Sequence, residues 1–225
     1  MTLTTPTKTS VISTIRTALA ALGTKGNPLE KLGPGKLYEA WTLATVLQNL
    51  RTHEGAKITA TSSTAMRLRA SHGPLDSKFT HFVCSTPFAQ FTIWTDIEVR
   101  TLSSLHRGAS PKVPVAGDKH ELDIVAVAAA AGTTGYPAPE DLFWGMECKH
   151  TAFTKAFHRS MLGIRRELSY ATGSPQPTPF RAYPRAAVQS IPSSALTAFS
   201  TDPAVTRYAP AGAEWDVDYE HLTMP

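Results

Sequence analysis

The spacing of apolar residues predicts two helices near the start of the chain. Apolar residues recur at helical spacing over residues 9–22, and glycines and prolines break the pattern between positions 23 and 35. Residues 36–51 are apolar on nearly every side, and Glu39 is their one acidic residue. A helix that is apolar all round is buried against more than one layer, so we expect the second helix to lie inside the molecule.

Strand-forming residues dominate the middle of the chain. Over residues 57–102 we predict a meander that ends in a long strand, because the odd positions 91, 93, 97 and 99 are apolar and alternate with polar residues. Residues 121–128 and 142–149 predict two more strands, separated by a loop at 132–139 that is rich in glycine and proline. The meander and these two strands form one predicted sheet.

The last third of the chain begins with a predicted amphipathic helix over residues 152–171. Its apolar residues are spaced by three or four, and four basic residues fall on the other side: Lys155, Arg159, Arg165 and Arg166. Prolines then predict a loop up to position 184, and residues 195–199 predict a strand that closes the sheet, followed by a helix-compatible stretch after Pro203. No repeat or linker divides the chain, so we expect one domain.

Composition narrows the function classes only slightly. With 225 residues and 42% hydrophobic residues the chain can bury a sizeable core, and no apolar run reaches the roughly 18 residues of a membrane span. The first thirty residues show no secretory signal, and the two cysteines, Cys84 and Cys148, form no zinc-binding pair, so we expect a cytoplasmic protein. A net charge of +4 permits a polyanionic partner without requiring one.

Three carboxylates and a lysine stand where the local pattern favours apolar residues. Asp123 interrupts an apolar strand, Glu39 interrupts the apolar helix, and Glu147 and Lys149 lie two apart on the strand after that of Asp123. Because strand side chains alternate, Glu147 and Lys149 share one face and Cys148 points the other way, into the core. If the two strands pair, Asp123 and Glu147 can converge beside an ammonium group, a set suited to binding Mg²⁺ and to hydrolysing phosphodiesters.

This pattern resembles the PD-(D/E)xK nuclease superfamily. The family signature is an acid on one strand and an acid and a lysine, one residue apart, on the next; here these are Asp123 and Glu147-Cys148-Lys149, with residues 124–146 between them. Many members also carry a glutamate in the helix before the sheet, where Glu39 stands, and the order of elements matches from about residue 36 to 199. The proline that often precedes the aspartate is replaced by Leu122.

The resemblance implies an α/β fold with a restriction-endonuclease-like core, a mixed central sheet flanked by helices. It divides the single domain into an N-terminal helix and loop (1–35), the core (36–200) and a C-terminal extension (201–225). It also implies that Asp123 and Glu147 hold Mg²⁺ or Mn²⁺ with the carbonyl group of Cys148, that Lys149 orients the attacking water, and that Glu39 completes the site.

The function that the resemblance implies is metal-dependent endonuclease activity on DNA, with restriction or phage defence as the expected role. We expect a homodimer, an activating or targeting partner protein, no membrane attachment, and DNA contacts from the basic helix face. Three alternatives stay open: a junction-resolving or repair nuclease, a subunit with this fold that binds without cutting, and an unrelated metabolic α/β protein whose acids form salt bridges.

Each candidate residue also has a purely structural interpretation. Glu147 and Lys149 are compatible with a solvated strand face, and Glu39 with an ion pair to a buried arginine. Asp96 and Glu98, on the long strand, either add ligands or belong to a half-exposed strand. No phosphate-binding loop, GxSxG elbow or HExxH zinc motif is present in the sequence, so metal-dependent hydrolysis is the one chemistry with converging residues.

Overall fold

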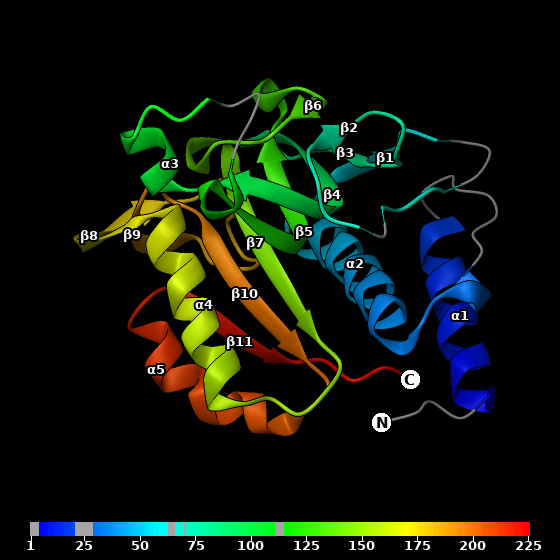
Figure 1. Ribbon diagram of the computed structural model, residues 1–225. Coiled ribbons are helices and arrows are strands. Elements are labelled where there is room, and N and C mark those ends of the chain that lie inside the picture. Colours follow the sequence, from blue (N-terminus) through cyan, green and yellow to red (C-terminus); the bar gives the residue numbers. More distant parts are fainter. Residues whose placement is uncertain (1–4, 21–28, 63–65, 70, 111–114) are drawn as a thin grey trace.

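A mixed sheet of seven strands forms the centre of the protein (Figure 1). The computed structural model describes residues 5–20, 29–62, 66–69, 71–110 and 115–225. The strand order in the main sheet is β1-β3-β4-β5-β7-β10-β11. Its strands are β1 (Lys57–Ala60), β3 (Phe82–Ser85), β4 (Gln90–Arg100), β5 (Lys119–Ala128), β7 (Leu142–Lys149), β10 (Ala195–Ser200) and β11 (Val217–His221).

The direction of the strands changes at β7. From β1 to β7 neighbouring strands are antiparallel, whereas β7, β10 and β11 run parallel. Parallel neighbours need a long crossover, and the segment between β7 and β10 contains helix α4 (Lys155–Leu168) and the hairpin of β8 (Tyr170–Pro177) and β9 (Ala187–Ile191). The protein therefore has an α/β fold with a mixed central sheet.

Helices cover both faces of this sheet. Helix α2 (Pro34–His53) packs on one face, with α1 (Thr5–Ala20) lying against α2, and α4 packs on the other face (Figure 1). We call the two apolar layers the α2-side core and the α4-side core. Sheet residues of the α2-side core include Phe91, Ile93, Ile124, Ala126, Trp144 and Met146. Sheet residues of the α4-side core include Trp94, Ile97, Val99, Leu122, Val125 and Leu196.

Short elements connect the strands. The short helices are α3 (Leu102–His106) and α5 (Ala209–Ala213), and a small sheet pairs β2 (Leu75–Asp76) with β6 (Thr134–Gly135). Short 3-10 helices are η1 (Leu29–Lys31), η2 (Ala116–Asp118), η3 (Ala129–Ala131), η4 (Pro139–Asp141) and η5 (Pro203–Tyr208). Strand β11 comes from the predicted C-terminal extension and pairs with β10, so residues 217–221 belong to the main sheet.

The sequence predicts most of these elements correctly. Strand β7 has its predicted bounds, and α2 and β5 lie within two or three residues of theirs. The predicted loop between 173 and 184 is partly wrong, because residues 170–177 form β8, which pairs with β9. Residues 21 and 22 of the predicted first helix and the following loop up to residue 28 lie outside the described residues.

The alternation of β4 changes at Asp96. Phe91 and Ile93 lie in the α2-side core, but Ile97 and Val99 lie in the α4-side core. Asp96 has a φ of 54°, a left-handed conformation that aspartate tolerates better than most side chains. The odd positions of this strand therefore do not share one face, contrary to the regular alternation predicted from the sequence.

In the part of the chain that is described, no helix combines the length and the apolar character that a membrane span requires.

Glu54 holds a distant loop against the end of α2. Its buried carboxylate accepts backbone N–H groups from Arg181 at 2.9 Å, Ala182 at 2.5 Å and Tyr183 at 2.7 Å. We predict that Glu54→Ala lowers the free energy of unfolding by about 2–4 kcal/mol, because hydrogen bonds to a charged acceptor are lost together. Urea denaturation measures this, with Glu140→Ala, at an exposed position, as the control. Equal stability of the two variants would contradict the prediction.

Candidate metal centre

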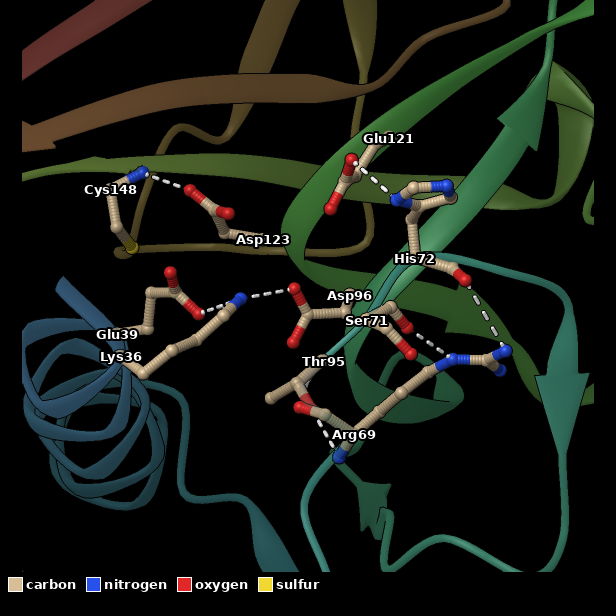
Figure 2. A network of polar contacts seen from close by, with 10 residues as sticks. All are labelled: Lys36, Glu39, Arg69, Ser71, His72, Thr95, Asp96, Glu121, Asp123 and Cys148. Atoms are coloured by element: carbon tan, nitrogen blue, oxygen red, sulfur yellow. Dashed lines mark hydrogen bonds and ion pairs between the residues drawn. The ribbon is translucent and has the colours of Figure 1, made fainter. Parts of the chain in front are cut away.

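Three carboxylates from different elements meet where α2 begins beside the sheet. Glu39 lies on α2, Asp96 on β4 and Asp123 on β5, and one oxygen of each lies within 4.8 Å of the others. Figure 2 shows the three side chains pointing toward one another. Divalent ions bind oxygen ligands at about 2.0–2.6 Å, so ligands on opposite sides of one ion lie about 4–5 Å apart. The spacing of these carboxylates therefore suits one divalent cation.

One lysine is ion-paired to two of these acids. The Nζ of Lys36 donates a hydrogen bond to Glu39 Oε2 at 2.6 Å and another to Asp96 Oδ1. The second oxygen of Asp96, Oδ2, is buried and has no hydrogen-bond partner among the described residues. The Asp96 side chain is only 1% exposed, and an unpartnered buried carboxylate oxygen is unfavourable. This oxygen is therefore available as a ligand for a cation.

The backbone explains how Asp123 reaches this position. After a register shift between Val127 and Ala126, regular pairing of β5 with β7 runs from Ala126 to Ile124, which lies opposite Met146. Asp123 comes next, and its Oδ2 accepts the backbone N–H of Cys148 at 2.7 Å (Figure 2). A side-chain oxygen therefore satisfies a backbone donor of β7 just beyond the paired region. This hydrogen bond fixes the orientation of the Asp123 carboxylate.

A loop before β2 lies beside Asp96. The backbone N–H of Arg69 donates to Thr95 Oγ1 at 3.2 Å (Figure 2). Gly73 forms a parallel bridge with Ile97. The Arg69 guanidinium is held by backbone carbonyl groups of its own loop, including that of Ser71 at 2.7 Å. These contacts hold the loop against the residues on both sides of Asp96. Asp96 itself has the left-handed backbone conformation.

The nearby positive charge does not fully stabilise the ionised forms of the three carboxyl groups. Burial raises the pKa of Asp123 to about 6, and burial together with the charge of Asp123 raises the pKa of Glu39 to about 8. Burial also raises the pKa of Asp96, although Lys36 acts in the opposite direction. Each shift means that the ionised form is disfavoured in the folded protein. A bound cation would lower all three pKa values.

The acid and lysine of β7 point to the other face of the sheet. Trp144 and Met146 belong to the α2-side core and Cys148 packs against it, so Glu147 and Lys149 face α4. Lys149 Nζ lies 5.3 Å from the centre of the Phe157 ring on α4. The predicted alternation along β7 is confirmed, as is the pairing of β5 with β7.

Glu147 nevertheless interacts electrostatically with the cluster. Its pKa is well above the usual value because of burial first and the charge of Asp123 second. Among the described residues, however, the group of carboxylates close enough to share an ion contains Glu39, Asp96 and Asp123 and does not contain Glu147. The structure thus brings two predicted site residues together, Glu39 and Asp123, and adds Asp96.

The basic face predicted for the last long helix needs one correction. Lys155, Arg159 and Arg166 are exposed on α4. Arg165 is only 5% exposed, and its guanidinium donates to the carbonyl oxygen of Ser194 at 2.8 Å and to Ser194 Oγ at 2.7 Å. Arg165 therefore anchors the start of β10 and does not lie on an exposed DNA-binding face. The reason is burial, because Arg165 lies between the buried residues Ile164 and Leu168 near the C-terminal end of α4.

The sequence pattern indicates Asp96 only as one of two possible additional ligands and does not indicate Lys36 as a site residue. Glu98, considered together with Asp96, pairs with Lys119 at 2.7 Å, away from the cluster. The signal for Lys36 was its position in the first turn of α2, where the helix dipole disfavours a positive side chain. A lysine at that position indicates acidic neighbours from elsewhere in the fold.

Comparison with protein-family models, with curated proteins and with solved structures finds no match for this chain.

The raised pKa values predict how stability depends on pH without metal. Carboxyls ionise near pH 4 when unfolded but near pH 6 for Asp123 and pH 8 for Glu39 when folded. The folded state therefore holds more protons in this interval, and the free energy of unfolding falls as pH rises from about 4 to 8.

We expect Glu39→Gln to reduce this decline by at least about 1 kcal/mol, since one pKa unit corresponds to about 1.4 kcal/mol. Urea denaturation in EDTA at several pH values measures the effect, and Glu140→Gln serves as the exposed control. An unchanged slope in Glu39→Gln would show that Glu39 does not carry a raised pKa.

Proposed function

We propose that this protein is a metal-dependent DNA endonuclease that hydrolyses phosphodiester bonds. The observation that carries the proposal is the group of three half-buried or buried carboxylates around the unpartnered Oδ2 of Asp96. Oxygen ligands in this number are what Mg²⁺ and Mn²⁺ take from proteins when they retain waters. A bound divalent ion would supply an activated water and positive charge at the reacting phosphate.

The arrangement of elements supports a restriction-endonuclease-like core. Glu39 is on the helix before the sheet, Asp123 is on a central strand, and the strand with Glu147 and Lys149 is its neighbour. After α4, β10 returns parallel to β7. These features agree with the order that the family resemblance implies, and each is also compatible with other α/β folds.

The three carboxylates of the cluster are close enough to one another to share one ion. Glu39, Asp96 and Asp123 would hold it, the Cys148 N–H would keep Asp123 oriented, and the carbonyl group of Cys148 would lie close by as the family resemblance implies. Glu147, whose pKa is raised by Asp123, would lie outside this ligand group and face α4.

DNA as the substrate is supported by charge. The chain has a net charge of +4, and Lys155, Arg159 and Arg166 are exposed on α4. Lysine and arginine contacts to phosphates supply most sequence-independent affinity for DNA. We further propose a cytoplasmic role in restriction or phage defence and a homodimeric assembly that places one site on each strand.

A second candidate is a subunit that binds DNA without cutting it. Lys36 already pairs with Glu39 and Asp96, and Lys149 contacts Phe157 on the other face. A cluster neutralised by its own lysine has less need of a metal ion. This candidate predicts DNA binding, weak or no Mn²⁺ binding, and no cleavage.

The test combines cleavage with metal binding. We expect the protein to cut circular duplex DNA in Mg²⁺ or Mn²⁺ and not in EDTA. Asp123→Asn should reduce the cleavage rate by at least about 100-fold, the size typical of losing electrostatic stabilisation at the reacting centre. It should also weaken Mn²⁺ binding in calorimetry, while Glu140→Asn, at an exposed position, leaves both unchanged. Metal-independent cutting, or full activity of Asp123→Asn, would contradict the proposal.

A further inference from the structure

Lys36 is the amine inside the carboxylate cluster. Its Nζ contacts Glu39 at 2.6 Å and also Asp96, so one ammonium group bridges α2 and β4 (Figure 2). Lys149, the lysine that the sequence pattern favours, has its Nζ over the Phe157 ring and faces α4. Lys149 therefore faces α4, whereas Lys36 and Glu39 come from α2, which packs on the other face of the sheet.

The Lys36 ammonium also lies at the boundary with solvent. The Lys36 side chain is 31% exposed, compared with 14% for Glu39 and 1% for Asp96. Lys36 is in the first turn of α2. The three residues before it, Gly33, Pro34 and Gly35, have no side chain larger than that of proline. A phosphate that approached the acids from solvent would therefore meet Lys36 before it met Asp96.

We propose that Lys36, in place of Lys149, is the catalytic lysine of this site. Its ammonium group binds a non-bridging oxygen of the phosphate that is cut, while the clustered acids hold the metal ion. This inference rests on the proposed function, because it assigns a residue to that reaction. A lysine is suited to the role, since its ammonium is a compact charge with three donors on a flexible stem.

The reaction needs no further reactant. Water oxygen bonds to phosphorus, one phosphorus–oxygen ester bond breaks, and the electron pair of that bond goes to the leaving oxygen. One water proton ends on the leaving oxygen, and the other stays on the new phosphate monoester or passes to solvent. Lys36 forms no bond, and its charge stabilises the negative charge that builds on the phosphoryl oxygens.

The competing role for Lys36 is that of a counter-ion alone. As a counter-ion it would occupy the place of the metal, so its removal would tighten Mn²⁺ binding and leave the cleavage rate unchanged or faster. As a catalytic residue its removal slows cleavage whether or not Mn²⁺ binding becomes tighter. The two roles therefore differ in the cleavage rate at saturating metal and DNA.

The experiment compares Lys36→Ala, Lys36→Arg and Lys149→Ala with the unchanged protein and with Lys78→Ala, at an exposed position outside the cluster. Cleavage rates are measured at saturating Mn²⁺ and DNA, Mn²⁺ affinity by calorimetry, and folding by thermal melting. We expect Lys36→Ala to lose about 100-fold in rate and to bind Mn²⁺ at least as tightly as before. Lys36→Arg, which keeps the charge and the fold, should be slowed less.

Several results would overturn this inference. A Lys36→Ala rate within threefold of the unchanged protein would make Lys36 a counter-ion, and a larger loss in Lys149→Ala than in Lys36→Ala would return the role to Lys149. Lys36→Ala could fail to fold. In that case, full activity of Lys36→Arg together with an inactive Lys149→Ala would assign the catalytic role to Lys149. Absence of cleavage by the unchanged protein in every metal would instead contradict the proposed function, and this inference with it.

Discussion

The ion pairs of Lys36 with Glu39 and Asp96 link the first turns of α2 to β4 of the sheet. Burying several carboxylates together is unfavourable unless a cation or hydrogen bonds compensate. One ammonium group and one backbone N–H, from Cys148, donate hydrogen bonds to these acids, and the charges of Arg69 and His72 also favour ionised Asp96. The raised pKa values of Glu39 and Asp123 show that this compensation is incomplete. This incomplete compensation supports the proposal that a cation binds at the cluster.

Two features of the sheet bring these charges together. The left-handed conformation of Asp96 interrupts the alternation of β4, and pairing between β5 and β7 ends where Asp123 turns to Cys148. Both irregularities occur in neighbouring strands beside the first turn of α2. Irregular backbone in otherwise regular strands is common next to functional sites, and here it places carboxylates where regular strands would place apolar side chains or solvent-facing ones.

The sequence predicts the parts of this structure that depend on local periodicity. Strand β7 has its predicted bounds, and Glu39 and Asp123, the acids that interrupt an apolar helix and an apolar strand, lie in one cluster. Asp96 was hard to predict, because a positive φ cannot be inferred from alternation. Arg165 has the spacing of an exposed residue, but its partner Ser194 is 29 positions away and known only from the fold. Long-range contacts of this kind leave no local pattern.

We propose that a divalent cation binds between Glu39, Asp96 and Asp123. A crystal structure of the protein soaked in Mn²⁺, with anomalous diffraction data, tests this claim most directly. The account predicts an anomalous peak on the α2 face of the sheet, with oxygen atoms of all three carboxylates at about 2.0–2.3 Å. A peak held by Glu147 on the α4 face, or no peak at saturating Mn²⁺ with Lys36 still paired to Asp96, would contradict it.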